Sequence, residues 1–147
     1  MAILASTGLR NALLDSGSLA TTLADGLIHI YQASTLPVSA DAAATGILLC
    51  TISLNSTGTG INFDATAVNG SLQKAPAEIW SGVNDQTGTA TYYRHVTAAD
   101  DGSFSTMFPR LQGTIDLVGV DMSLSAVGLS ICATQTLDYY VVTLPAA

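Results

Sequence analysis

The residues able to act as a catalytic base or a metal ligand are few in this chain of 147 residues, which has two histidines, His29 and His95. A serine hydrolase brings together a serine, a histidine and an acid, commonly with a Gly-x-Ser-x-Gly turn that exposes the nucleophile. That pentapeptide does not occur. His29 stands among apolar residues in Leu-Ile-His-Ile-Tyr, which favours a hydrogen-bonded histidine in a core or an interface. The sequence therefore predicts no catalytic residue and no enzyme.

The sole glutamate, Glu78, precedes the sole tryptophan, Trp80, by two positions. A carboxylate beside an aromatic ring can contribute to sugar binding, but glycoside cleavage needs a pair of carboxylates that flank the sugar. We interpret Glu78 as a solvated strand residue beside a core tryptophan. The acids in Asp100-Asp101-Gly102 invite a calcium site, but the alternating acids and closing glutamate of an EF-hand loop are missing. This segment is typical of a hairpin turn.

Cys50 and Cys132 both lie in apolar, strand-like segments, GILLCTISL and GLSICATQT. These surroundings favour buried free thiols in a reducing cytosol, where disulfides are rare. Neither cysteine has a CxxC partner or a histidine at the spacing of a zinc site. We expect no metal site and no cofactor.

Charged residues make up only 10% of the chain, against roughly 25% in an average soluble domain. Because free-standing soluble proteins usually need charge to stay dispersed, this composition predicts a subunit whose faces are covered by neighbours. The net charge is −7 and the basic residues are scattered, which disfavours binding to phosphate backbones. They are Arg10, Lys74, Arg94 and Arg110.

Membrane insertion and secretion are also disfavoured. No apolar run approaches the roughly 20 residues of a membrane span, and MAILASTGLR lacks the charged start and cleavage site of a signal peptide. We therefore expect neither nucleic acid nor a membrane among the partners, and a chain kept in a cytosol until assembly.

Residues 7–16 are predicted to form a short amphipathic helix, because Leu9, Ala12 and Leu13 fall on one face and Gly17 follows as a natural stop. Residues 1–25 would then be a helical arm or cap on a β domain of residues 26–147, within a single domain overall. The helix would cover one end of that domain or dock on a neighbouring subunit.

Short alternating segments separated by turns predict about eight to ten strands after residue 26. Asn69-Gly70 is the signature of a type I′ hairpin, and residues 134–144 read as one closing strand. In residues 89–97 Tyr92 and Arg94 alternate with Tyr93 and His95, the two-residue period of a sheet. The pattern predicts a mainly β fold, an antiparallel β-sandwich of immunoglobulin-like or jelly-roll type with a short N-terminal α-helix.

Three blocks, in this order, carry a resemblance. They are IHIYQASTLPVSADAAATGILLCTISL (28–54), EIWSGVNDQTGTATYYRHVTAADDG (78–102), and RLQGTIDLVGVDMSLS followed by QTLDYYVVTLP (110–145). The chain resembles a family of small structural proteins of tailed-bacteriophage virions. Members share an Ile-x-Ile-Tyr strand, a Pro-x-Ser-Ala-Asp-x-Ala-x-Thr-Gly-x-Leu-Leu segment, a Gly-Thr-Ala-x-Tyr/Trp-Phe/Tyr-Arg strand and a final Thr-Leu-Pro. The match covers most of residues 26–145 and brings no catalytic residue with it.

The resemblance implies a virion component, and the role we expect is a decoration (cement) protein on the capsid surface, assembled in the host cytoplasm. It would brace major capsid proteins or other virion proteins as a homo-oligomer, with a trimer favoured. A neck, collar or tail-associated subunit is the alternative within the virion. A host-surface carbohydrate-binding module that uses Trp80, Tyr92 and Tyr93 is the alternative of another class.

Six residues are the candidate assembly contacts: Leu9, Leu13, Trp80, Tyr92, Tyr93 and Arg94. We expect Arg94 to be anchored by an acid that holds neighbouring strands or subunits in register. Asp85, Asp100 and Asp116 are the candidates for that acid.

Overall fold

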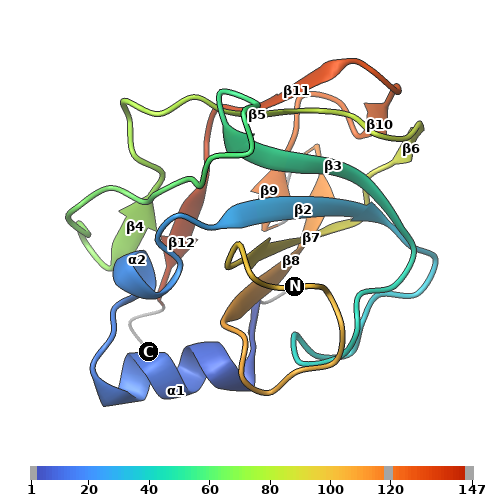
Figure 1. The fold of residues 1–147 in the computed structure, drawn as a ribbon. Coiled ribbons are helices and arrows are strands. Elements are labelled where there is room, and N and C mark those ends of the chain that lie inside the picture. The colour runs from blue at the N-terminus through green and yellow to red at the C-terminus, as the bar shows by residue number, and fades with distance from the viewer. Residues whose placement is uncertain (1–2, 118–120, 145–147) are drawn as a thin grey trace.

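A computed structural model of the chain describes residues 3–117 and 121–144 and has a mainly β fold with short helices near its N-terminus (Figure 1). The helices are α1 (Thr7–Asp15) and α2 (Leu19–Thr22). The strands are β1 (Leu4–Ala5), β2 (Leu27–Gln32), β3 (Ile47–Leu54), β4 (Ser71–Gln73), β5 (Trp80–Val83), β6 (Gly88–Thr89), β7 (Tyr92–Val96), β8 (Arg110–Asp116), β9 (Met122–Ser123), β10 (Gly128–Leu129), β11 (Thr134–Leu137) and β12 (Val141–Thr143).

One sheet dominates the molecule, with its strands in the order β1-β8-β7-β2-β3-β5-β11 and β9 added beside β8. Every pair along this path is antiparallel, whereas β8 and β9 are parallel. Two-stranded sheets, β10-β6 and β12-β4, flank it. The antiparallel, mainly β fold predicted from the alternating pattern is confirmed, and its packing is sandwich-like.

The large sheet curls on itself. Trp80 on β5 and His95 on β7 are separated by two intervening strands, which in a flat sheet would place their backbones roughly 14 Å apart. Their ring centroids are nevertheless 6.1 Å apart. The two halves of the sheet therefore face each other, and the apolar core fills the space between them.

The alternation of β2 decides which side chains enter that core. Ile28 and Ile30 are fully buried inside the curl, whereas His29 and Tyr31 lie on the opposite, outer face of the sheet. An irregularity in the pairing of β2 with β3 lies between Ile30 and Tyr31, and Tyr31 stacks on Tyr92 of β7 with ring centroids 4.9 Å apart. The loops 33–46 and 97–109 cover much of this outer face, and Tyr92 and Arg94 on it are buried.

The helix predicted from Leu9 and its neighbours is α1. It begins after Ser6, whose side chain accepts a hydrogen bond from the backbone N–H of Leu9 and so caps the helix. Leu9 and Gly8 are its buried residues. A Cβ at Gly8 would lie 2.3 Å from the carbonyl oxygen of Met107, so only glycine allows the helix to pack this closely against the loop 97–109.

The turn predicted at Asn69-Gly70 is confirmed. Both residues have positive φ, 53° and 76°, as a type I′ turn requires. The backbones of Val68 and Ser71 exchange hydrogen bonds of 2.9 and 3.0 Å across it.

Three predicted boundaries differ from the structure. Residues 134–144 form two strands, because β11 pairs with β5 and β12 pairs with β4, and the chain changes partner at residues 138–140. The final Thr-Leu-Pro ends at Pro145, which lies outside the described residues. Asp100-Asp101-Gly102 lies within the longer loop 97–109 and does not close a tight hairpin. The predicted arm, residues 1–25, also supplies β1, which pairs with β8.

Candidate functional site

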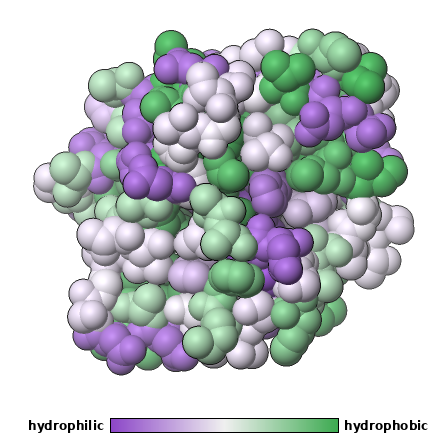
Figure 2. Space-filling model, viewed as in Figure 1, coloured by the Kyte–Doolittle hydropathy of each residue, from purple (hydrophilic) through white to green (hydrophobic). Residues whose placement is uncertain are grey.

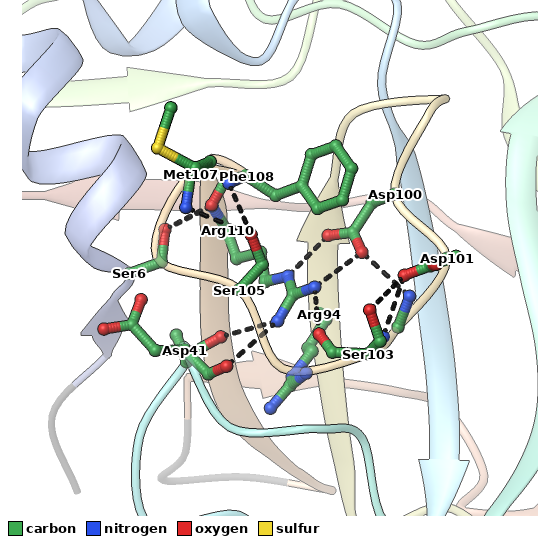
Figure 3. Close-up of polar contacts among 12 residues, drawn as sticks. Ser6, Asp41, Arg94, Asp100, Asp101, Ser103, Ser105, Met107, Phe108 and Arg110 are labelled. Carbon is green, nitrogen blue, oxygen red and sulfur yellow. Dashed lines mark hydrogen bonds and ion pairs between the residues drawn. The ribbon is translucent and has the colours of Figure 1, made fainter.

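A buried ion pair links the loops that cover the outer face of the sheet (Figure 3). Arg110 is fully buried at the start of β8. Its guanidinium donates to both carboxylate oxygens of Asp100, with Nε–Oδ2 and Nη2–Oδ1 distances of 2.5 and 2.7 Å. It also donates to the carbonyl oxygens of Ser103 at 2.6 Å and Ala40 at 3.1 Å. One side chain therefore fixes both the loop 97–109 and the loop 33–46.

The start of α1 is tied to the same loops by short side chains. The Ser6 hydroxyl donates to the carbonyl oxygen of Phe108 at 2.8 Å and accepts from the backbone N–H of Arg110 at 2.9 Å. The backbone N–H and the hydroxyl of Thr7 donate to the two carboxylate oxygens of Asp41, at 2.7 and 2.6 Å. Burial acts to raise the pKa of Asp41, but the hydrogen bonds from Thr7 outweigh it and hold that pKa below its ordinary value.

Arg94 does not have the acidic anchor that its sequence context suggests. Its Nε donates to Oε1 of Gln112 at 2.9 Å, and its Nη2 lies 3.4 Å from the carbonyl oxygen of Ser39. Asp100, one of the predicted partners, is paired with Arg110 instead. The prediction of an acid–Arg94 pair is therefore wrong, and burial lowers the pKa of Arg94.

The aromatic residues that were candidates for contacts with partners belong to the interior. Trp80, Tyr92 and Tyr93 are each 0% exposed. The Trp80 indole donates its Nε1–H to the carboxylate of Glu78 at 2.8 Å, so the one glutamate serves a core tryptophan. The hydroxyl of Tyr92 donates to the carbonyl oxygen of Thr45 at 2.8 Å, which holds the end of the loop 33–46.

Five of the six predicted assembly contacts are thus wrong as surface residues, because Leu9, Trp80, Tyr92, Tyr93 and Arg94 are all buried within the chain. Leu13 is 41% exposed and stays a prediction. The sequence could not separate these cases, because alternation says which residues share a face and not whether loops cover that face. The prediction that both thiols are buried is also half wrong: Cys50 is buried and Cys132 is exposed.

His95 lies in an aromatic enclosure and cannot act as a base there. It is fully buried, and neither ring nitrogen has a hydrogen-bond partner among the described residues. Its ring lies 5.2 Å from Phe63 and 6.0 Å from Tyr140, centroid to centroid. Burial alone lowers the pKa of His95 to about 3, so the ring is neutral at physiological pH.

The other histidine, His29, is half-buried on the outer face with its Nδ1 3.4 Å from the Tyr31 hydroxyl. Burial lowers the pKa of His29 as well. Among the described residues no group of three or more His, Cys, Asp or Glu side chains could hold a metal ion. In the same part of the chain, no helix has the length and apolar character needed to cross a membrane.

What the described surface does offer is exposed apolar side chains. At least fourteen large ones are exposed. They are Leu4, Leu13, Leu14, Val38, Ile47, Val68, Ile79, Val83, Phe104, Met107, Leu117, Ile131, Tyr139 and Leu144. Figure 2 shows hydrophobic side chains gathered at the upper right, over the end of the molecule that carries β6 and β10.

Some of the most exposed of these side chains come from the elements that the buried ion pair and Ser6 hold together. We define the α1-end surface as Leu14, Val38, Phe104 and Met107, which are 84%, 91%, 68% and 82% exposed. They lie on α1, on the loop 33–46 and on the loop 97–109. The pairing of their supporting residues, Asp100 and Arg110, was missed at the sequence level, where Asp100 was a candidate partner of Arg94. No signal in the sequence shows this pair, because it depends on the pairing of Val96 with Arg110 across β7 and β8 and on the path of the loop 97–109.

Comparisons of the chain with protein-family models, with curated proteins and with solved structures find no match.

Proposed function

We propose that this protein is a structural subunit of a tailed-bacteriophage virion, and that it acts as a capsid decoration (cement) protein bracing the major capsid proteins. The observation that carries the proposal is the balance of its surface. At least fourteen large apolar side chains are exposed, whereas the sequence has only fifteen charged residues and three of those, Arg94, Asp100 and Arg110, are buried. Where such side chains gather, as at the upper right of Figure 2, contiguous exposed apolar patches mark surfaces that bind other proteins.

The way the α1-end surface is held supports docking onto a preformed assembly. Arg110 fixes the loops that carry Val38, Phe104 and Met107, and Ser6 fixes the start of α1 to one of them. A surface fixed before it binds loses less conformational entropy on docking. We therefore assign the α1-end surface as the contact with the major capsid protein.

A second set of exposed apolar residues lies at another part of the molecule. Val83 ends β5 and Ile131 lies between β10 and β11, and they are 49% and 54% exposed. A trimer needs two different patches on each subunit, since its interface is heterologous. The presence of separate apolar regions supports the proposal of a homo-oligomer, with a trimer favoured.

A neck, collar or tail-associated subunit is the second candidate, because the same surface would suit it. The carbohydrate-binding alternative, as formulated for Trp80, Tyr92 and Tyr93, is overturned by the burial of all three rings. An exposed ring is needed to stack on a sugar.

The number of copies per particle separates capsid decoration from a neck or tail position. Purified virions would be analysed by quantitative mass spectrometry, with the major capsid protein as the internal reference. We expect hundreds of copies, and about six or twelve copies, the numbers that ring symmetry on the tail axis gives, would refute the decoration role. Particles assembled without the protein should lose their DNA at a lower temperature.

The contact assignment has its own test with a matched control. Met107→Glu places a charge in the α1-end surface, and Val68→Glu makes the same change at a 64% exposed valine beside the Asn69-Gly70 turn. We expect Met107→Glu to weaken binding to undecorated capsids by about tenfold or more, since a buried unpaired charge is costly. Val68→Glu should bind like wild type. Equal binding by both variants would exclude the α1-end surface as the contact.

A further inference from the structure

The strand β11 lies at one edge of the large sheet and is outermost in Figure 1. It pairs with β5 on one side. Among the described residues, no other backbone hydrogen bond involves residues 134–137. An open strand edge presents a row of N–H and C=O groups that can pair with another strand.

The register of β11 shows which of its backbone groups point outward. The carbonyl oxygen of Ala133 accepts from the N–H of Asn84 at 2.9 Å, and hydrogen-bonded pairs alternate along an antiparallel ladder. Gln135 opposite Gly82 and Leu137 opposite Trp80 are therefore the positions that bond to β5. The N–H and C=O groups of Thr134 and Thr136 point away from the sheet.

Nothing on β11 opposes pairing with a further strand. Natural edges are protected by lysine, by proline or by inward charges, and β11 has the sequence Thr-Gln-Thr-Leu. Its exposed side chains are the neutral Thr134 and Thr136. At this edge the side-chain amide of Gln135 donates a hydrogen bond to the carbonyl oxygen of Thr136 at 3.2 Å. This contact protects the edge only weakly, because a carbonyl oxygen has a second lone pair that can accept a bond from another strand. The end of β4 differs, because Lys74 follows it directly and Pro76 comes two residues later.

We propose that β11 pairs antiparallel with β11 of a second copy of this chain across a two-fold axis at Gln135. In that register Thr134 of each copy lies opposite Thr136 of the other, and their outward groups form four backbone hydrogen bonds. The same axis brings the exposed Ile131 of one copy towards the exposed Tyr139 of the other, which are 54% and 74% exposed. These self-complementary features select a second copy as the occupant.

The charges fit this register as well. No acid of one β11 segment lies opposite an acid of the other, because Asp138 falls opposite Cys132. The whole chains still repel each other, since each carries a net charge of −7. Added salt should therefore strengthen the association by screening that repulsion. The contact is short, so it forms a weak dimer in solution, and it concerns the isolated chain whatever its place in a virion.

The test is sedimentation of the purified full chain over a wide concentration range at low and high salt. We expect a monomer–dimer equilibrium that shifts towards dimer with salt. The double variant Thr134→Lys/Thr136→Lys sets like charges opposite each other and should raise the dissociation constant by about tenfold or more. The control Thr89→Lys/Thr143→Lys makes the same change in net charge on exposed threonines of β6 and β12 and should leave it within about twofold.

Amide hydrogen exchange gives a second readout that does not depend on the variants. The amides of Thr134 and Thr136 should exchange more slowly as protein concentration rises, whereas the amide of Gln135 is bonded to β5 at every concentration. A monomer at all concentrations would overturn the proposal. Equal weakening by both double variants, or exchange of Thr134 and Thr136 that is independent of concentration, would overturn it too.

Discussion

The substitution Asp100→Asn tests directly whether the Asp100–Arg110 ion pair holds the loops 33–46 and 97–109 in place. Asp100→Asn keeps the size of the side chain and removes its charge, which leaves the guanidinium of Arg110 buried with only carbonyl and amide oxygens around it. Both side chains of the pair are at most 1% exposed. Breaking a buried pair by removing one partner costs about 3–5 kcal/mol. For a domain of this size each kcal/mol lowers the melting temperature by about 2–4 °C, so we expect a fall of roughly 6–20 °C.

Asp101→Asn is the matched control, one residue along the same loop. Asp101 is exposed and its carboxylate accepts from the backbone N–H and the hydroxyl of Ser103 at 3.0 and 2.6 Å. Both variants would be followed by thermal and urea unfolding at pH 7 with circular dichroism. Asp101→Asn should melt close to wild type. If the two variants lost the same stability, the ion pair would not be what holds these loops.

Three further outcomes follow from single features of the fold. The pKa of His95 is about 3 in the folded protein and about 6.5 in the unfolded chain. Above pH 6.5 the ring is neutral in both states, so its titration takes nothing from the free energy of unfolding. As the pH drops from 6.5 towards 3, protonation of His95 in the unfolded chain lowers the free energy of unfolding by about 1.4 kcal/mol per pH unit. His95→Leu should reduce the pH dependence of the free energy of unfolding by that amount, which urea unfolding at several pH values would measure. Gly8→Ala should lower the free energy of unfolding by about 1–3 kcal/mol despite the better helix propensity of alanine, because its Cβ meets the Met107 carbonyl. Asn69→Ala should cost about 1 kcal/mol, since φ there is 53°, and chemical denaturation of both variants checks these values.

The parts of the fold that sequence could predict are those set by neighbours along the chain. Ile28 and Ile30 share one face of β2 because they are two residues apart, and both enter the core. The turn at Asn69-Gly70 depends on two adjacent residues that tolerate positive φ. The start of α1 follows from a serine cap and a buried leucine.

The parts that sequence could not predict depend on the path of the loops. Arg94 and Arg110 lie on the same face of neighbouring strands, and which of them receives Asp100 is decided by how the loop 97–109 folds back. Cys132 has apolar neighbours, yet its φ of 68° turns the chain there and its side chain is exposed. The two covering loops hide Tyr92 and Arg94 from solvent, so a face that looked functional in the sequence is interior.

The contacts of Ser6 also set an order of folding during synthesis. Its hydroxyl bonds to Phe108 and Arg110, and β1 beside it pairs with residues 111 and 112 of β8. A ribosome adds about 5–20 residues per second, so β1 and α1 wait roughly 5–20 s after their own synthesis for these partners. During that interval Leu9 has no core to enter, and β8, once made, gives β1 its partner while β9 to β12 are still to be synthesised.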